Sequence, residues 1–289
     1  MVNIREYVRD ELKKYDGIYL PVRAGILEQL FVKQLSPKKL HPNPDDEFCF
    51  KEVGPSDEII SKYVKQIRFN QEHSLDLFDE PVMIEKMHPD GYMLINGHHR
   101  WAAALMLNVK KIPVKVTNVT HASDIIGQME KSDRSKRASI NLDDVVFCQN
   151  STEQAEKQLF FPFNKFYPER IRSGIPGLMF ALQNAGYDVW VYTSGYSSTD
   201  HISRLFRYHQ INADGIINGA NRLNSGREND MGRVKDLMAQ KYRITLNIDM
   251  ESVSWIRSES KDFEMIDIPS DKGQWAQQVI TIVRGLKDL

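Results

Sequence analysis

The segment GYMLINGHHRWAAALMLNVKKIPVKV, residues 91–116, specifies the fold class of the first half of the chain. Its apolar run at 92–95 predicts a strand, the run rich in Ala and Leu at 101–107 predicts a helix, and IPVKV at 112–116 predicts another strand. Between the first strand and the helix lies a polar turn, Asn96-Gly97-His98-His99-Arg100. These features predict a small mixed α/β domain.

Flanking patterns extend this domain toward both ends. Helical spacing predicts helices over 3–14 and 56–68, and short apolar runs predict strands over 30–34 and 81–87. Residues 128–138 are polar and locally basic and have no apolar period, so they are expected to form a linker.

The second half of the chain has a different order of predicted elements, in which strands and helices alternate. The predicted strands lie at 138–142, 189–193, 215–218 and 244–248, and the helices at about 169–185, 199–208, 232–241 and 275–286. Parallel strands need crossover connections, so this alternation predicts a parallel, Rossmann-like α/β sheet with helices on both faces. With 289 residues and about 150 residues per domain, we expect domains over 1–127 and 139–289.

Composition excludes several classes of protein. Lys and Arg number 38 against 39 Asp and Glu, a formal net charge of −1, which argues against nucleic-acid binding through global charge. Cys49 and Cys148 are too few for a disulfide framework or a cysteine zinc site. The N-terminal segment is charged, and no stretch approaches the ~20 apolar residues that cross a bilayer, so we expect a cytoplasmic protein without membrane contact. The basic residues in 131–137 could contact a nucleic-acid backbone, although a solvated linker explains them better.

The turn at 96–100 has the outline of an anion site. Gly97 permits backbone angles that a side chain would forbid, and the first amides of the following helix lack partners within that helix. Arg100 could add a bidentate fork to a phosphate, and His98 or His99 could donate protons or hydrogen bonds. The simpler interpretation is a tight turn whose histidines are solvated or cap the helix.

This segment, with FVKQLSPKKLHPNP at 31–44 upstream, resembles the N-terminal domain of ParB partition proteins and the sulfiredoxin-like superfamily that contains it. The resemblance covers residues 30–116 and implies that Asn96 to Arg100 bind nucleotide phosphates of CTP, ATP or ADP, with Mg²⁺ bridging them. Sulfiredoxins carry a reactive cysteine at the position of His98, and ParB proteins carry Glu-Arg-Arg at 98–100. No helix-turn-helix pattern follows, so DNA partitioning is not expected.

The free-serine-kinase-like members of the superfamily resemble this loop best, because they have a Gly-His-x-Arg form of it. In those members a carboxylate in the upstream turn acts as base, which implies Asp45, Asp46 or Glu47 here. The catalytic candidates of the first domain are therefore His98, His99, Asp46 and Glu47. Three neighbouring acids in a turn are also compatible with a solvated surface.

Residues 139–289 resemble the haloacid-dehalogenase-like (HAD) phosphatase fold. These enzymes place two aspartates two positions apart after the first strand, the first as nucleophile and Mg²⁺ ligand and the second as general acid and base. In INLDDV at 140–145, the resemblance puts Asn141 at the nucleophile position and Asp143 at the acid–base position. The stretch between this motif and the next predicted strand is too short for a large cap domain.

Three further motifs of that family are matched in order. A Thr or Ser ends the next strand, a lysine neutralises phosphate charge, and acids after a later strand hold Mg²⁺. The matching residues are Thr193 with Ser194, then Lys235, then Asp249, with Glu251 as an outer partner. The implied Mg²⁺ ligands are Asn141, Asp143 and Asp249.

Asn141 limits what this second site can do. A carboxylate attacks phosphorus, whereas an amide is a poor nucleophile and brings no charge to Mg²⁺. Met250 stands where many members have a second acid, so metal affinity should fall further. One interpretation is a natural pseudophosphatase that keeps ligand binding, and the other is an engineered change in an active enzyme.

Together these patterns predict phosphoryl-group chemistry. The first domain would bind a nucleotide and transfer or hydrolyse its phosphate, with a small molecule or a macromolecule as phospho-substrate. The second domain would be a weak or inactive phosphatase. The alternatives are a nucleotide-switched interaction module without turnover, and a HAD phosphatase whose nucleophile was substituted.

Overall fold

The computed structural model describes residues 3–15, 20–219, 228–260, 262–269 and 275–286. The chain divides into two units, residues 1–118 and 119–289. Each unit has its own sheet and its own large hydrophobic core.

A mixed sheet forms the frame of the first unit. Its strands pair in the order β2-β6-β4-β5-β3, with β1 against β4, and neighbours are both parallel and antiparallel. The strands are β1 Leu20–Pro21, β2 Gln34–Leu35, β3 Leu40–His41, β4 Val82–His88, β5 Tyr92–Asn96 and β6 Ile112–Val116. The helices are α1 Ile4–Tyr15, α2 Ile26–Phe31, α3 Asp57–Glu72 and α4 His98–Met106, with 3-10 turns η1 Pro37–Lys39 and η2 Glu47–Cys49. The predicted small mixed α/β architecture is confirmed.

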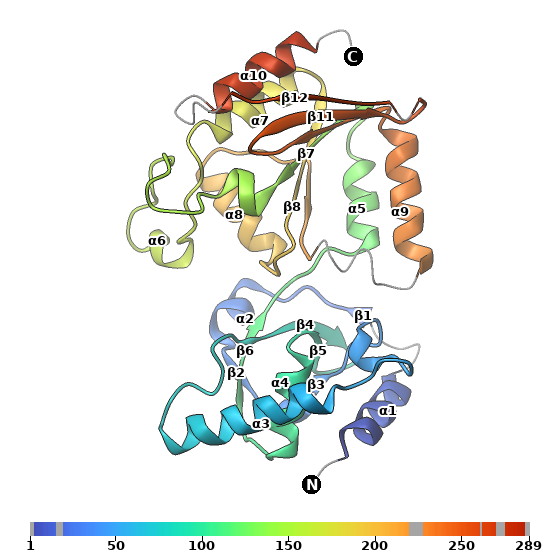
Figure 1. The fold of residues 1–289 in the computed structure, drawn as a ribbon, viewed down its shortest axis with the longest axis vertical. Helices are drawn as coiled ribbons and strands as arrows, with labels where there is room; N and C mark the ends of the chain where they lie inside the picture. Colours follow the sequence, from blue (N-terminus) through green and yellow to red (C-terminus); the bar gives the residue numbers. More distant parts are fainter. Residues whose placement is uncertain (1–2, 16–19, 220–227, 261, 270–274, 287–289) are drawn as a thin grey trace. The chain divides into compact units, whose positions relative to one another are not determined.

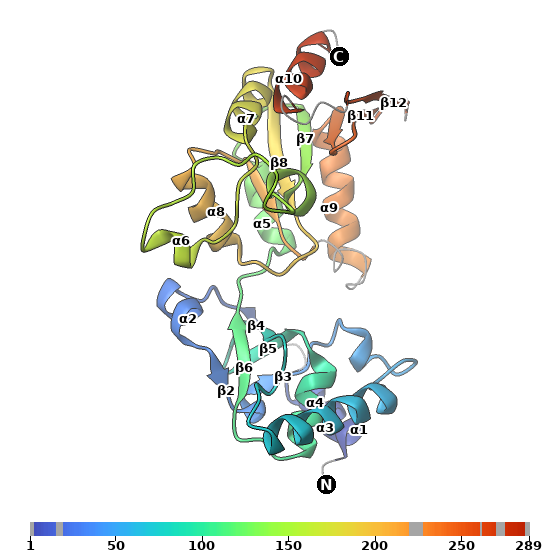
Figure 2. The ribbon, with the colours of Figure 1, turned by 60° about the vertical axis from the view of Figure 1, so that its left-hand side comes forward.

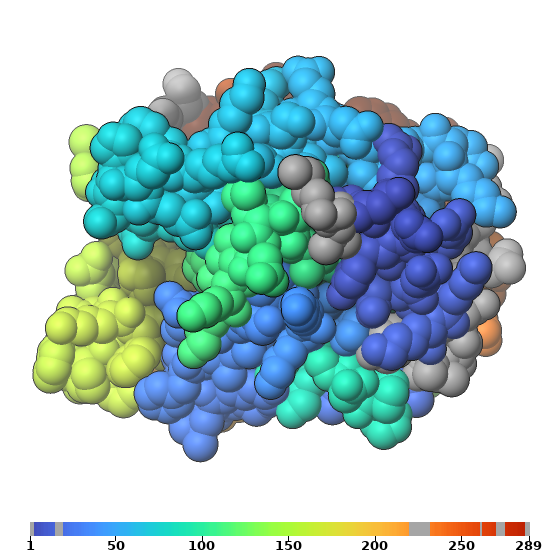
Figure 3. All heavy atoms as spheres, turned by 90° about the horizontal axis from the view of Figure 1, so that it is seen from below, coloured from blue at the N-terminus to red at the C-terminus, as the bar shows by residue number. Residues whose placement is uncertain are grey.

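Helices α1, α3 and α4 lie together on one face of this sheet (Figures 1 and 2). Their apolar side chains and those of β4, β5 and β6 form one core. Trp101 is fully buried in it and donates its indole N–H to the Pro37 carbonyl at 2.9 Å. The small side chains of Ala102, Ala103 and Ala104 are also fully buried, and α4 packs closely on α3. In Figure 3 the cyan atoms of α3 accordingly lie beside the green atoms of the chain that follows α4. This packing fixes the first turn of α4 against the sheet.

The predicted strand over 30–34 is wrong for most of its length. Residues 26–31 form α2, and only Gln34 and Leu35 pair with β6. Leu27 and Phe31 of α2 are exposed, so the helix has no buried face that would produce a clear period. A short apolar run does not distinguish a strand from a helical segment.

The second unit is built on another sheet, with strand order β12-β11-β10-β7-β8-β9. The strands are β7 Lys136–Asn141, β8 Tyr187–Tyr192, β9 Gly215–Ile217, β10 Ile244–Ile248, β11 Ser252–Arg257 and β12 Phe263–Asp267. The helices are α5 Ala122–Met129, α6 Phe163–Phe166, α7 Ile175–Asn184, α8 Thr199–Tyr208, α9 Glu228–Lys241 and α10 Trp275–Gly285, with a π-helical turn η3 Leu142–Val146.

This second sheet is mixed, which corrects the prediction of a parallel one. Strands β10, β7, β8 and β9 are parallel as predicted, whereas β11 and β12 are added antiparallel. The sequence pattern missed both added strands. All five residues of β12 are exposed, and in β11 residues 253–255 are buried in succession, so no apolar alternation marks either strand.

Helices cover both faces of the second sheet (Figures 1 and 2). Val189 and Val191 of β8 join the core formed with α7, α8 and α10. Trp190, which lies between them, joins a separate cluster formed with α5 and α9. Successive side chains of a strand point to opposite faces, so this division places helices on each side. Among the described helices, none has the length and apolar character needed to span a membrane.

The boundary between the units lies earlier than predicted, at 118/119 rather than at 127. Residues 122–129 form α5, whose Ile125 and Met129 are buried beside side chains of α9. Strand β7 begins at Lys136, so most of the predicted linker at 128–138 is an ordered part of the second unit. The two turns of α5 are too few to give a recognisable period.

The basic residues of that segment are also used within the second unit. Arg134 Nη1 lies 3.4 Å from the buried carboxylate of Asp188. The Arg137 guanidinium lies 5.6 Å from the centre of the Tyr242 ring, and burial lowers the pKa of Arg137. The interpretation of these two residues as a solvated face is therefore wrong.

Candidate functional site

The turn between β5 and α4 places a helix start directly after a buried strand. Gly97 has φ +95°, in the left-handed region, and is the N-cap of α4. A Cβ at this position would lie 3.1 Å from two guanidinium nitrogens of Arg100 and 3.3 Å from Val82 Cγ2. Glycine is therefore required for the backbone angle and for the close approach. The first backbone N–H groups of α4 have no acceptor within the helix, as at any helix start.

His98 is held by the turn that follows β3. It is 4% exposed, and its Nε2 accepts a hydrogen bond from the Asn43 backbone N–H at 3.2 Å. Its Nδ1 lies 3.5 Å from Asp46 Oδ2. Because Nε2 accepts, a neutral imidazole carries its proton on Nδ1, facing Asp46. The structure therefore brings His98 and Asp46 together as a histidine–carboxylate pair.

His99 has a different partner. Its Nε2 accepts a hydrogen bond from the Ser56 backbone N–H at 3.3 Å, just before α3. Burial lowers the pKa of His99, and the charge of Asp46 only partly opposes this shift. The Phe48 ring contacts both histidines, with centroid distances of 5.4 Å to His98 and 5.0 Å to His99. A neutral His99 therefore serves as an acceptor that ties the turn to α3.

Arg100 braces the turn. It is 8% exposed, its Nη1 donates to the Glu80 carbonyl at 2.6 Å, and its Nη2 lies 3.4 Å from Asn96 Oδ1. These contacts join the two ends of the turn at Asn96 and Arg100. A phosphate would have to replace one of these partners to meet the guanidinium, so the predicted bidentate contact stays a prediction.

The upstream turn adds a buried amide that sequence reasoning missed. Asn43 Oδ1 accepts from the Asp45 backbone N–H at 3.1 Å, while Asn43 Nδ2 is buried and has no hydrogen-bond partner among the described residues. A buried amide donor without an acceptor is unfavourable by about 1–3 kcal/mol, which favours an acceptor at this point. Asp46 Oδ1 caps η2 by accepting from the Phe48 N–H at 3.0 Å, and the neighbouring Glu47 is exposed. The prolines on either side of Asn43 indicated only a turn.

Cys49 lies in the same turn and is not a reactive thiol. Burial first, and then the charges of Asp46 and Asp45, raises the pKa of Cys49 to about 12. The thiolate is the nucleophilic form, so this cysteine is inert at neutral pH.

A second polar cluster lies where β7, β8 and β10 end. Asn141 is the last residue of β7, Thr193 follows β8, and Asp249 follows β10, and these three strands are parallel neighbours. Thr193 Oγ1 lies 2.8 and 2.7 Å from the two carboxylate oxygens of Asp143, to which it donates. The same hydroxyl accepts from the Gly195 backbone N–H at 2.9 Å. The structure therefore brings the predicted residues Asp143 and Thr193 into direct contact.

Asn141 is used to shape the turn that follows β7. Its Oδ1 accepts from the backbone N–H groups of Asp143 at 2.8 Å and Asp144 at 3.3 Å. Its Nδ2 donates to Asp144 Oδ2 at 2.9 Å. A carboxylate at position 141 would keep the two bonds to backbone N–H groups but would face Asp144 with a like charge.

Asp144 and Asp249 form the acidic part of this cluster. Burial first, and then the charge of Asp144, raises the pKa of Asp249. Burial and the charges of both aspartates also raise the pKa of Tyr192. In the described part of the chain, no group of three or more His, Cys, Asp or Glu is arranged to hold a metal ion. Asp144 was not predicted, because the family pattern drew attention to Asp143 beside it.

The remaining predicted residues lie at the edge of the cluster or outside it. Ser194 is exposed, and the hydroxyl that meets Asp143 belongs to Thr193 instead. Lys235 is an exposed residue of α9. Met250 contributes its carbonyl, which accepts from the Trp275 indole N–H at 2.9 Å. The carbonyl of Glu251 accepts from a backbone N–H at 2.7 Å, and its carboxylate borders a cavity of about 1210 Å³.

Arg172 is the third residue that sequence reasoning missed. Its Nε donates to the Val145 carbonyl at 2.8 Å, and its Nη2 donates to the carbonyls of Asp144 at 3.0 Å and Phe147 at 3.2 Å. Its Nη1 lies 2.5 Å from Glu153 Oε2. Arg172 therefore holds the π-helical turn that follows Asn141. The partners are backbone carbonyls remote in sequence, and no local pattern marks such contacts.

Part of this chain is similar to known proteins. Residues 27–132 match the ParB N-terminal domain. A structure of the C-terminally truncated chromosome-partitioning protein ParB from Caulobacter crescentus complexed with CTP-gamma-S is similar at 21% sequence identity and a TM-score of 0.25, covering 36% of this chain and 54% of that chain. The same truncated protein complexed to the centromeric parS site is similar at 23% identity and a TM-score of 0.23, covering 34% and 46%. The chain therefore spans about half the length of these ParB chains. No curated protein matches it.

Proposed function

We propose that residues 27–132, which match the ParB N-terminal domain, bind a nucleotide at the turn 96–100. The observation that carries this proposal is the left-handed turn at Gly97, which opens α4 and leaves its first N–H groups without helical acceptors. The buried Nδ2 of Asn43, next to the backbone N–H that His98 accepts from, would supply another donor. Backbone and amide N–H groups of this kind suit the phosphate oxygens of CTP, ATP or ADP.

We infer further that the bound nucleotide is turned over. The Nδ1 of His98 faces the carboxylate of Asp46, and its Nε2 accepts from the Asn43 N–H, so His98 could act as a general base toward a hydroxyl acceptor once its Nε2 leaves that N–H. The Nε2 of His99 is likewise occupied, by the Ser56 N–H, but burial lowers the pKa of His99, and Glu47 is exposed, so both are weaker candidates. Mg²⁺ would bridge and neutralise the phosphates. Sulfiredoxin-like cysteine chemistry is disfavoured by the raised pKa of Cys49.

The rival is a nucleotide-switched interaction module that retains its nucleotide without turnover. The buried contacts of His98, with Asn43 on one side and Asp46 on the other, suit this rival equally well, because they could serve only to fix the turn. The two functions differ in the fate of the phosphate, so labelled nucleotide separates them.

The first experiment incubates the full chain with CTP, ATP and ADP, each carrying a labelled terminal phosphate, and Mg²⁺. We expect binding of at least one nucleotide and release or transfer of label, and we expect His98→Gln to slow turnover by about 10²–10⁴-fold, the usual contribution of a general base. His73→Gln is the matched control, since His73 is exposed at the end of α3 and stacks on Phe69. Bound but unchanged nucleotide would favour the switch, and no binding at all would contradict both functions.

We propose, as a second function, that the second unit is a HAD-like domain without a large cap that binds a phosphorylated ligand without hydrolysing it. Support comes from the contact between Thr193 and Asp143 beside Asn141, at the ends of neighbouring parallel strands. Ligands of open α/β sheets bind at this edge. Lys235 would approach the phosphate as a cation, although it is exposed on α9.

The oxygen donors of this cluster suit Mg²⁺ in type. Asn141, Asp143 and Asp249 would be its ligands. A bound cation would also offset the repulsion between the carboxylates of Asp144 and Asp249. When bound, Mg²⁺ would polarise the phosphoryl oxygens. The Asp143 carboxylate already accepts the single hydroxyl proton of Thr193, and Asn141 brings no charge, so we expect weak binding.

The second experiment compares Asn141→Asp with Asn141→Ala. We expect Asn141→Asp to make thermal stability depend on Mg²⁺, because the new carboxylate faces Asp144 and a cation offsets the repulsion. Hydrolysis of a panel of phosphomonoesters should stay near background, since Met250 remains in the place of an acid. A large Mg²⁺-dependent gain in hydrolysis would instead identify an active phosphatase whose nucleophile was substituted.

A further inference from the structure

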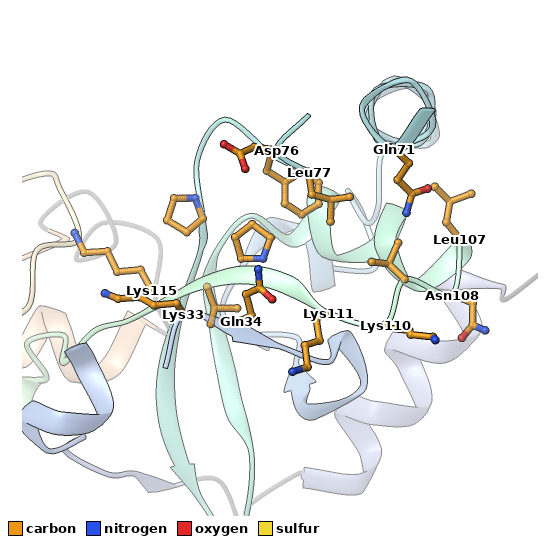
Figure 4. Close-up of a pocket in the computed structure, with 15 residues that line it drawn as sticks. Lys33, Gln34, Gln71, Asp76, Leu77, Leu107, Asn108, Lys110, Lys111 and Lys115 are labelled. Atoms are coloured by element: carbon orange, nitrogen blue, oxygen red, sulfur yellow. The ribbon is translucent and has the colours of Figure 1, made fainter. Parts of the chain in front are cut away.

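The first unit contains a groove that is separate from the turn at 96–100. The groove has a volume of about 950 Å³ and lies among β2, the end of α3, residues 76–81, and the chain that runs from the end of α4 into β6. Four exposed lysines border it, Lys33, Lys110, Lys111 and Lys115. In Figure 4, Lys33 and Lys115 lie at one end, Lys110 lies toward the other, and Lys111 lies between them.

The geometry of β6 explains why these positive charges form a row. Ile112, Val114 and Val116 are buried, so the residues that alternate with them point to the open side of the strand. At a rise of about 3.3 Å per residue, Lys111 and Lys115 are spaced about 13 Å apart along the chain. The Val114 N–H donates to the Lys33 carbonyl at 2.9 Å, which sets Lys33 beside the same stretch.

The positive charge of the groove is not neutralised locally. In the described ranges, no ion pair joins any of the four lysines to an acidic side chain. Asp76 is the acid among the lining residues, and in Figure 4 it lies across the groove from the lysines. The chain as a whole has a formal net charge of −1, so this local excess is not a consequence of composition.

We propose that this groove binds a segment of single-stranded nucleic acid. A row of lysines suits a chain of regularly spaced phosphates better than a single phosphate group. Apolar side chains also line the groove, including Leu77, Val109 and Pro113, and they suit the faces of unstacked bases.

The polar residues of the groove discriminate between anionic partners. Gln34, Gln71 and Asn108 each offer a donor and an acceptor, and Asp76 offers only acceptors while ionised. Base edges present donors and acceptors and so match this set. An acidic peptide would bring carboxylates toward Asp76 and is therefore disfavoured.

The experiment measures anisotropy of fluorescent single-stranded oligonucleotides, DNA and RNA, with the full chain over a range of salt concentrations. We expect Lys111→Gln/Lys115→Gln to weaken binding at least tenfold at low salt. We also expect it to lower the slope of log affinity against log salt by about 1.4, which is about 0.7 for each lost phosphate contact. Lys62→Gln/Lys65→Gln is the matched control, since both residues are exposed on α3 outside the groove and the change in charge is the same.

A second variant, Lys33→Gln/Lys110→Gln, tests the two ends of the row and should weaken binding in the same direction. Circular dichroism checks that each variant keeps its fold. Absence of binding by the wild type, an equal loss in the Lys62/Lys65 control, or tighter binding of poly-glutamate than of the oligonucleotides would each overturn the proposal. A mononucleotide that binds at the turn 96–100 should not displace the oligonucleotide, so failure of the nucleotide site leaves this proposal standing.

Discussion

The turn at Gly97 and the strand ends around Asn141 are both polar clusters at the ends of buried strands, but the first presents mainly hydrogen-bond donors and the second mainly carboxylates. The first cluster offers backbone N–H groups and the Asn43 amide, and its one close carboxylate, Asp46, faces His98. The second offers the carboxylates of Asp143, Asp144 and Asp249. The first can therefore meet an anion directly, whereas the second needs a cation before a phosphate can approach.

The two clusters also differ in what holds them in place. The first depends on one backbone conformation, because the φ of Gly97 sets the direction of α4. The second depends on side chains, because the Thr193 hydroxyl joins Asp143 to the backbone after β8. A change of one residue should therefore disturb the first through strain and the second through a lost hydrogen bond.

The largest effect should come from Gly97→Ala. A left-handed conformation costs a residue with a side chain about 1–2 kcal/mol, and the new Cβ would crowd Arg100 and Val82. We expect the free energy of unfolding of the first unit to fall by at least that amount, and nucleotide affinity to fall at least tenfold. Urea unfolding followed at Trp101 measures the first quantity, and calorimetric titration with CTP, ATP and ADP measures the second.

Gly127→Ala is the control for this change. Gly127 lies in α5, and a Cβ there would meet nothing within 4 Å. Alanine is favoured over glycine in a helix by about 1 kcal/mol, so this variant should be as stable as the wild type or more stable. Equal behaviour of the two alanine variants would show that the turn at Gly97 is not strained by a side chain.

The contrast between the clusters also explains what the sequence could predict. The first cluster is largely local, and its strand, glycine and helix lie within residues 92–106, so the pattern located it correctly. The part that the pattern missed, Asn43, is contributed by a turn 55 residues before His98 in the chain. No periodicity carries that information, because a long-range contact depends on how the sheet is paired.

Long-range contacts also explain the errors in the second unit. The pattern found Asn141, Asp143, Thr193 and Asp249, each at the end of a predicted strand. It missed Arg172, whose partners are backbone carbonyls 25–28 residues away. It also missed β12, because an exposed edge strand has no buried face to mark it.

A moderate effect is expected from Thr193→Val. The hydroxyl of this buried residue donates to Asp143 and accepts from the Gly195 N–H, and valine removes both contacts while keeping the shape. Leaving a buried partner unpaired costs about 1–3 kcal/mol, and since Asp143 and Gly195 are only half-buried, the second unit should lose stability toward the lower end of that range. Thr193→Ser keeps the hydroxyl and should lose less. Equal losses in the two variants would show that the methyl group, and not the hydroxyl, stabilises this position.

The smallest effect is a difference in pH dependence between the units. His99 has a lowered pKa in the folded state, so the neutral form is favoured on folding and its contribution to stability is lost as the pH falls below about 6.5. Asp249 has a raised pKa, so the folded state binds the proton more tightly, and stability falls as the pH rises above about 4. Acidification from pH 6.5 to 4 should therefore destabilise the first unit through His99 and stabilise the second unit through Asp249.

Fluorine NMR of protein labelled with 5-fluorotryptophan can follow the two units separately, because Trp101 reports on the first and Trp190, Trp255 and Trp275 report on the second. Urea midpoints taken at several pH values should show His99→Gln flattening the profile of Trp101 alone. Asp249→Asn should flatten only the profile of the other three. The Asp249 effect should be weaker, because that carboxyl is only partly removed from water and solvent screens its charge. Parallel pH profiles in the two units would contradict the pKa shifts of His99 and Asp249. A histidine that is neutral as an acceptor is destabilised by protonation, whereas a carboxyl repelled by a neighbouring carboxylate is stabilised by it.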